Sequence, residues 1–113
     1  MPEEIINIKN LNHFNQISND FKDKIVVINF WSNWCQQCKS FFEIYDKLYQ
    51  EYNNSFLFAK VNVSENLAIP RLYQVSWIPT IIFIKNKVLI KKIPGLANYD
   101  SLKIVLEKIK SNM

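Results

Sequence analysis

The sequence predicts an α/β fold in which helices cover both faces of a central mixed β-sheet. Strand-like and helix-like segments alternate through the first part of the 113 residues. Two strand-like segments then follow each other across a short polar turn, and a helical segment ends the chain. The predicted element order is therefore βαβαβαββα, and such alternation closed by a hairpin is typical of a mixed sheet with helices on both faces.

The first four predicted elements are two strands that alternate with two helices. Residues 5–9 form a short strand, and from Asn10 onward apolar residues recur at helical spacing. Residues 24–30, KIVVINF, are a continuous apolar run typical of a strand buried on both faces. A second helix is predicted over residues 35–52, and its apolar face is formed by Cys38, Phe41, Tyr45, Leu48 and Tyr52.

The second half of the chain supplies the remaining elements. Residues 55–63 alternate enough to form a strand, and residues 65–73 form a short helix that is bent at Pro70. PTIIFIK and VLIKKI flank the polar turn Lys85-Asn86-Lys87 and predict an antiparallel hairpin. Asn98 can cap a final helix whose buried side carries Tyr99, Leu102, Val105, Leu106 and Ile109.

Length and composition indicate one compact domain, residues 1–113. Hydrophobic residues make up 49% of the chain, which is enough to bury one core. No apolar run approaches the roughly 20 residues that a membrane-spanning helix needs. The acidic opening Met1-Pro2-Glu3-Glu4 has no apolar segment behind it and does not resemble a secretory signal. We therefore expect no membrane partner and a cytoplasmic location, or an organelle if a targeting segment has been removed.

The net charge of +4 comes almost entirely from lysines scattered along the chain. The one cluster, Lys85, Lys87, Lys91 and Lys92, spans the predicted hairpin, and Arg71 is the only arginine. An arginine-containing stripe with interleaved aromatic residues would better support nucleic-acid binding. We therefore interpret the lysines as solvated surface and expect no nucleic-acid partner.

Cys35 and Cys38 are the only cysteines, and three roles are open to them: a structural staple, half of a metal site or a redox centre. A staple across so short a loop removes little chain entropy, so it would stabilise the fold only weakly. A metal site needs four ligands, or three and a water molecule. His13, the only histidine, is predicted to lie outside the apolar face of the first helix. We therefore expect no metal.

A redox pair suits the predicted position at a helix N-terminus. The first N–H groups of a helix lack intrahelical partners, and the helix dipole favours negative charge there. Cys35 is therefore expected to ionise readily and to act as the attacking nucleophile. Cys38 lies one turn further into the helix, on the buried face, from where it can attack a mixed disulfide formed at Cys35.

Four separated segments resemble the thioredoxin family. VVINFWSNWCQQCK is similar to the family's strand followed by W-C-x-x-C-K, and FAKVNV resembles its central strand with a lysine. WIPT, residues 77–80, resembles the loop that carries a cis proline, and IPGL, residues 93–96, resembles the glycine segment near the active site. The resemblance implies the thioredoxin fold and an enzyme that reduces protein disulfides. Cys35 would form a mixed disulfide with the substrate, and Cys38 would resolve it.

The resemblance also implies how substrates and electrons reach the site. Pro79 would be cis and packed beside the disulfide, and the backbone of Ile78 would pair with an extended substrate segment. An apolar docking rim would be formed by Trp34, Ile78, Gly95 and Leu96. No cofactor is implied beyond the redox-active Cys35–Cys38 disulfide, because electrons would come from a separate reductase that resembles thioredoxin reductase. Nothing in the sequence demands a dimer, so we expect a monomer.

Several residues depart from the family pattern. Asn29 stands where the family has a buried aspartate thought to shuttle the proton of the resolving thiol. An amide cannot act as a general base, so we expect slower resolution by Cys38. Lys60, the family's partner for that aspartate, would either lower a thiol pKa or reach solvent. Trp77 replaces a smaller residue and is expected to enlarge the docking rim.

Gln36 and Gln37 replace the usual Gly-Pro between the cysteines. Their amides can donate hydrogen bonds to a Cys35 thiolate, and the loss of the proline loosens the turn. Stabilising the thiolate makes a dithiol pair more oxidising, so the predicted potential lies above the roughly −270 mV of thioredoxin.

Two other functions stay open. A more oxidising pair would suit a disulfide oxidase or isomerase in an oxidising compartment, and the redox potential distinguishes it from a reductase. A thioredoxin fold used for partner binding, with secondary redox activity, fits both Asn29 and Trp77. Replacement of both cysteines by serine distinguishes this module, since docking would survive the change and redox transfer would not.

Overall fold

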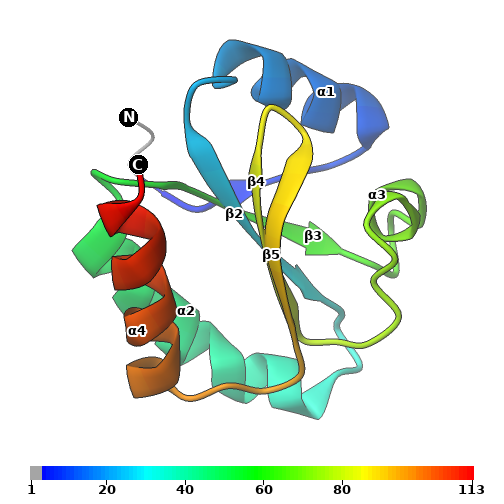
Figure 1. Cartoon of the computed structure of the whole chain (residues 1–113). Coiled ribbons are helices and arrows are strands. Elements are labelled where there is room, and N and C mark those ends of the chain that lie inside the picture. Colours follow the sequence, from blue (N-terminus) through cyan, green and yellow to red (C-terminus); the bar gives the residue numbers. More distant parts are fainter. Residues whose placement is uncertain (1–3) are drawn as a thin grey trace.

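The computed structural model describes residues 4–113 (Figure 1). Residues 1–3, which make up most of the acidic opening segment, lie outside the described residues. The strands are β1 (Ile6–Asn7), β2 (Ile25–Trp31), β3 (Leu57–Asn62), β4 (Thr80–Lys85) and β5 (Val88–Pro94). The helices are α1 (Leu11–Asp20), α2 (Gln36–Tyr52), α3 (Ala68–Leu72) and α4 (Tyr99–Ser111).

The five strands form one mixed sheet in the order β1-β3-β2-β4-β5. The central strand β2 pairs in parallel with β3 and antiparallel with β4. Helices α1 and α3 lie on one face of the sheet, and α2 and α4 lie on the other (Figure 1). The predicted element order and the predicted layers are therefore confirmed.

Strand β2 is buried along nearly its whole length because both of its faces carry apolar side chains. Val26, Ile28 and Phe30 belong to a cluster on the side of α1 and α3. Ile25 and Val27 belong to a second cluster, which contains the apolar face of α2 and two residues of α4. The same alternation directs Asn29 toward the side of α2, and its strand ends just before the cysteines.

Helix α2 is tied to the sheet through Tyr45. This side chain is fully buried, and its hydroxyl donates to the backbone oxygens of Val27 at 3.0 Å and Ala59 at 2.7 Å. Burial raises the pKa of Tyr45 well above its ordinary value, so the hydroxyl stays protonated as a donor. These bonds hold the helix in a set position relative to β2 and β3.

Element boundaries differ from the predictions where side chains compete for backbone groups. The first strand has only two residues, whereas residues 5–9 were expected. The short helix begins at Ala68 rather than at residue 65, because the Asn62 and Asn66 side chains accept the N–H groups of Ser64 and Ile69. Such Asx bonds form turns in place of helix.

The hairpin turn is shorter than predicted. Lys85 pairs with Val88, so only Asn86 and Lys87 form the turn, with φ angles of 49° and 69°. Two positive φ angles are typical of the tight turns that match the twist of a hairpin. Lys92 is not solvated surface, because its Nζ donates to the backbone oxygens of Tyr73 and Gln74 at 3.1 Å.

The predicted buried side of α4 is confirmed. Leu102 and Leu106 are fully buried, and three half-buried residues pack against the same core cluster: Tyr99, Val105 and Ile109. His13 is half-buried, and its Nδ1 accepts the Lys9 N–H at 3.1 Å. The caps behave as expected, since the Asn98 side chain accepts the N–H of Ser101. Of the helices within residues 4–113, none is long and apolar enough to cross a membrane.

Candidate active site

The two cysteines lie where β2 passes into α2 and are joined by a disulfide. Cys35 is the N-cap of α2, and its Sγ accepts the backbone N–H of Cys38 at 3.1 Å. Their Cα atoms are 5.3 Å apart. Cys38 is 0% exposed, whereas Cys35 keeps 6% of its surface. Cys35 is therefore the cysteine that a partner reaches first.

Asn29 and Lys60 are neighbours on β2 and β3, where they are paired in the parallel register. Asn29 is 0% exposed, and neither its Nδ2 nor its Oδ1 has a hydrogen-bond partner among the described residues. Lys60 is half-buried, and its Nζ lies 5.8 Å from the ring centres of both Trp31 and Phe42. The ammonium is therefore placed beside aromatic rings that favour a cation.

Two further polar groups near the cysteines are buried without a partner within residues 4–113: Trp31 Nε1 and Ser32 Oγ. Ser32 follows the end of β2, and its backbone oxygen accepts the Cys35 N–H at 3.3 Å. Ser32 was not among the predicted site residues, although its position between the strand and the cysteines is a signal in the sequence. Polar atoms of this kind are uncommon in folded proteins and are more frequent at functional sites.

Gln36 and Gln37 are both exposed in the first turn of α2. In the disulfide form, the hydrogen bond to Cys35 Sγ comes from the backbone N–H of Cys38. Neither glutamine side chain bonds to Cys35 within the described chain. Their predicted role toward a thiolate stays a prediction.

The Ile78–Pro79 peptide bond is cis, as the resemblance implies. The Pro79 backbone oxygen accepts the N–H of Gly95 at 2.8 Å, which joins this loop to the end of β5. Gly95 has a φ of +84°, a conformation that glycine adopts without strain. A Cβ at Gly95 would lie 3.9 Å from Trp77 Nε1, so the edge of the indole lies beside this glycine.

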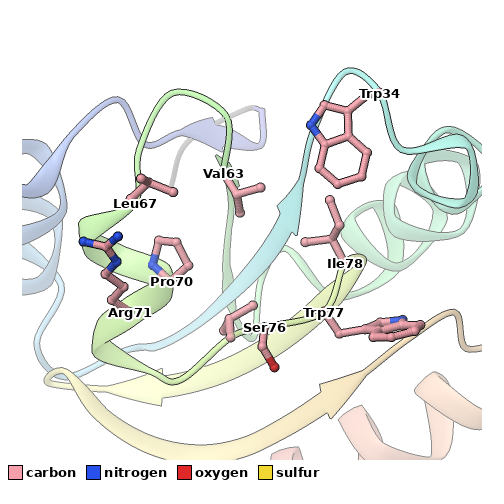
Figure 2. A pocket seen from close by; sticks show the side chains of 9 residues that line it. Trp34, Val63, Leu67, Pro70, Arg71, Ser76, Trp77 and Ile78 are labelled. Carbon is pink, nitrogen blue, oxygen red and sulfur yellow. The ribbon is translucent and has the colours of Figure 1, made fainter.

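Large apolar side chains are exposed around this loop: Trp34 at 73%, Trp77 at 63% and Leu96 at 53%. Figure 2 shows the half-buried Ile78 between the two tryptophans. Exposed tryptophans close together are typical of interaction surfaces. The structure thus brings the predicted rim residues together and places Trp77 at the surface rather than in the core.

A groove extends from this rim to helix α3 (Figure 2). Its volume is about 280 Å³, and it is lined by Trp34, Val63, Leu67, Pro70, Arg71, Val75, Ser76, Trp77 and Ile78. Arg71 and Leu67 were not among the predicted site residues. They lie far from the cysteines along the chain, so no local pattern indicates that they share a surface.

Comparison with known proteins identifies the family. Residues 4–108 match the family model described as Thioredoxin. The chain belongs to the thioredoxin family. The thioredoxin of Coprinus comatus is 32% identical over 102 residues, which cover 89% of this chain and 93% of that protein.

Other thioredoxins are longer than this chain. Thioredoxin-T of Drosophila melanogaster is 39% identical over 87 residues, 77% of this chain and 55% of that protein. The mitochondrial thioredoxin of Mus musculus is 30% identical over 96 residues, 80% of this chain and 58% of that protein. The chain therefore spans just over half the length of these two relatives.

Solved structures show the same fold. The Malassezia sympodialis thioredoxin superposes with a TM-score of 0.85 at 27% identity, covering 95% of this chain and 91% of that one. The reduced thioredoxin of Schistosoma mansoni gives a TM-score of 0.84 at 27% identity, covering 94% and 98%. The predicted thioredoxin fold and family membership are confirmed. Within residues 4–113, no group of three or more His, Cys, Asp and Glu side chains is arranged to hold a metal ion.

Proposed function

We propose that this thioredoxin-family chain reduces protein disulfides, with residues 1–113 acting as one monomeric domain in a reducing compartment such as the cytoplasm. The observation that supports this most directly is the Cys35–Cys38 disulfide at the start of α2, in which Cys35 keeps 6% of its surface exposed and Cys38 keeps none. This asymmetry is what a pair needs if one sulfur attacks and the other resolves.

The reaction begins with the reduced pair. The Cys35 thiolate attacks one sulfur of a target disulfide, the target S–S bond breaks, and the second target sulfur leaves as a thiolate. The N–H groups at the start of α2, including that of Cys38, favour negative charge on Cys35 Sγ. The product of this step is a mixed disulfide between Cys35 and the target.

The second step releases the target. The Cys38 thiol gives its proton to solvent, and its thiolate attacks Cys35 Sγ. The Cys35–Cys38 bond forms, the bond from Cys35 to the target breaks, and the target sulfur leaves as a thiolate that takes up a proton from solvent. Two electrons have then passed to the target, and a separate thioredoxin-reductase-like protein restores the dithiol. No prosthetic group, nucleic acid or membrane is part of this proposal.

The step in which Cys38 loses its proton has no carboxylate at position 29 to act as a general base. Asn29 lies in the buried layer below the site and carries an amide, which has no basic group at neutral pH. Lys60 is its neighbour across the strands. We propose that the proton of Cys38 leaves slowly, so the mixed disulfide persists longer than it would with a carboxylate at this position.

Docking of the target uses the exposed rim. Trp34, Trp77 and Leu96 supply apolar area around the cis loop. The backbone of Ile78 pairs with an extended target segment, so the segment passes beside Cys35. Gly95 keeps this path open because it has no side chain.

Insulin reduction with dithiothreitol as electron donor tests the proposal. The wild-type chain should accelerate reduction, Cys35→Ser should fall to the uncatalysed rate, and Cys38→Ser should accumulate a mixed disulfide detectable by mass spectrometry. Lys108→Ala, an exposed change on α4, is the matched control and should behave as wild type. A Cys35→Ser variant that keeps the wild-type rate would refute the proposal.

The exposed rim also supports a second candidate, a partner-binding module with secondary redox activity. Trp34 and Trp77 offer apolar area that a docking function alone would use. Two results together would favour this candidate over the reductase. The Cys35→Ser/Cys38→Ser variant would bind an isolated partner with wild-type affinity, and the wild-type chain would reduce insulin no faster than the uncatalysed rate.

A further inference from the structure

We infer that the groove between Trp34 and α3 selects target segments that carry a carboxylate side chain near the attacked cysteine, and that Arg71 is the specificity-determining residue. This inference rests on the proposed disulfide reductase function and specifies its substrate class. The expected occupant is an extended segment of a disulfide-containing protein with an Asp or Glu beside apolar residues.

The groove has one charged side chain in an otherwise largely apolar wall. Of the residues in 4–113 that line it, Ser76 is the only other polar one. The rest of the wall is apolar and consists of the two tryptophans with Val63, Leu67, Pro70, Val75 and Ile78. Arg71 lies on the α3 side next to Pro70 and Leu67, at the end of the groove away from Trp34 and Ile78 (Figure 2). A segment that spans the groove from Trp34, the neighbour of Cys35, to α3 therefore reaches Arg71 at the α3 end.

The positive charge of Arg71 has no partner within the described part of the chain. No carboxylate among the described residues lines the groove. The Arg71 guanidinium makes no hydrogen bond or ion pair with residues 4–113. Lys103 behaves differently, since its Nζ lies 3.4 Å from Glu51 Oε2. An unpaired cation at the edge of an apolar groove favours an anionic partner group.

The chemistry of arginine suits this role. Its planar guanidinium binds a carboxylate through two parallel N–H bonds, which a lysine ammonium does not reproduce. A docked segment would cover the apolar walls and exclude water, so the ion pair would be screened less than on an open surface. The net charge of +4 also draws acidic segments toward the chain.

Peptide homodisulfides test the inference. Each peptide carries one cysteine and one variable residue, which is glutamate, glutamine or lysine. The variable residue lies one to four positions before or after the cysteine, and each peptide tests one such position. The reduced wild-type chain should reduce the best glutamate peptide about three- to tenfold faster in kcat/KM than its glutamine counterpart, the range expected for one partly desolvated ion pair. Arg71→Gln should remove this preference, and Arg71→Glu should reverse it in favour of lysine.

Lys108→Glu is the matched control, because it changes the net charge as much as Arg71→Glu but lies on α4, on the opposite face of the sheet. It should keep the preference for glutamate. Equal preferences in wild type and Arg71→Glu, or the same loss in Lys108→Glu, would overturn the inference. Reduction of all peptides at equal rates would refute the carboxylate preference alone, whereas no reduction of any peptide would refute the proposed function as well.

Discussion

The two ends of helix α2 are built in opposite ways. At its N-terminal end, the cysteines follow strand β2, which carries the fully buried Asn29, and the amide atoms of Asn29 have no partner among residues 4–113. Exposed tryptophans surround this end, and Arg71 contributes an unpaired charge to the adjoining groove. Polar and apolar groups at this end are available to a partner.

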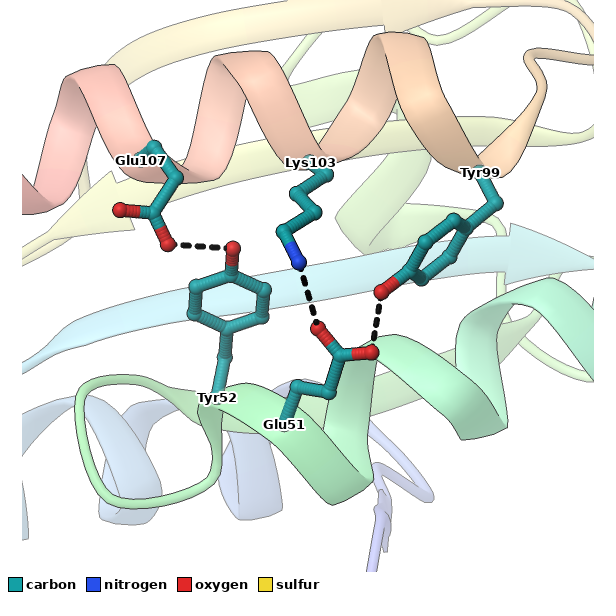
Figure 3. Close-up of polar contacts among 5 residues, drawn as sticks. All are labelled: Glu51, Tyr52, Tyr99, Lys103 and Glu107. Carbon is teal, nitrogen blue, oxygen red and sulfur yellow. Dashed lines mark hydrogen bonds and ion pairs between the residues drawn. The ribbon is translucent and has the colours of Figure 1, made fainter.

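At the C-terminal end, polar groups are paired with helix α4 (Figure 3). The hydroxyl of Tyr52 donates to Glu107 Oε2 at 2.5 Å, and the hydroxyl of Tyr99 donates to Glu51 Oε1. Lys103 forms an ion pair with the other oxygen of Glu51 at 3.4 Å. The Lys47 and Lys103 ammonium groups also lie over the ring of Tyr99.

The difference shows how one helix combines a reactive end with a stable one. The paired end and the buried Tyr45 fix α2 on the sheet, so the cysteines are presented from a rigid base. The N-terminal end can then keep unpaired polar atoms and exposed apolar surface that lower stability. Four predictions test this comparison.

Asn29→Asp should produce the largest effect, because it adds a general base beneath the reactive end. We expect the single-turnover release of target from the mixed disulfide to accelerate about tenfold or more at neutral pH. Asn29→Leu is the control, since it removes the unpaired amide without adding a base. It should give no gain in rate and should leave stability unchanged or raise it by about 1–3 kcal/mol. No gain in Asn29→Asp would show that the amide does not limit resolution.

The double variant Gln36→Gly/Gln37→Pro should lower the redox potential of the pair. The proline stiffens the turn and the two amides no longer favour the thiolate, so we expect a decrease of about 30 mV, which corresponds to about 1.4 kcal/mol. Equilibration with a defined thiol buffer measures this. Gln50→Ala, at the opposite end of α2, should leave the potential unchanged. A wild-type potential at or below about −270 mV would contradict the expected oxidising character.

Tyr52→Phe removes the hydrogen bond to Glu107 while it keeps the buried ring. The free energy of unfolding in urea should fall by about 1 kcal/mol. Burial, followed by the bond to Glu107, raises the pKa of Tyr52 above its ordinary value, so the hydroxyl stays a donor at neutral pH. The redox potential should not change, and a shift in potential would show that the two ends of α2 are coupled.

Glu51→Gln should have the smallest effect, because this carboxylate is on the surface. The Tyr99 hydroxyl first and then the Lys103 ammonium hold the pKa of Glu51 below its ordinary value. A lowered carboxyl pKa contributes stability that is present above the unfolded value and is lost as pH falls through the folded value. The small difference in melting temperature between wild type and variant should therefore shrink below about pH 4. A difference that grows on acidification would contradict this pairing.

The fold was predictable because its determinants are local or periodic. The apolar run of β2, the apolar face of α2 and the Asn98 cap each act within a few residues along the chain, and each predicted element is present. Boundaries were less predictable where side chains compete with the backbone. Asn62 and Asn66 shortened the helix at α3, and the pairing of Lys85 shortened the turn.

The candidate site was predictable only in part. The C-x-x-C spacing and a helix start at Cys35 place both sulfurs within one turn, so their proximity follows from the sequence. The unpaired state of Asn29 could not be read from the sequence, because it depends on which groups β3 and α2 bring near. Lys60 was left with two roles, and the structure places its ammonium beside Trp31 and Phe42.

The sequence alone determines the order of elements and places a reactive sulfur pair at the start of a helix. It can do so because periodicity and spacing depend only on neighbours along the chain. Tertiary packing alone decided that Arg71 shares a groove with Trp34 and Ile78. The same packing places Trp77 beside Gly95 and leaves Asn29 buried without a partner among residues 4–113. These arrangements join residues distant in sequence, and their energies arise only when the sheet and helices close around a common core.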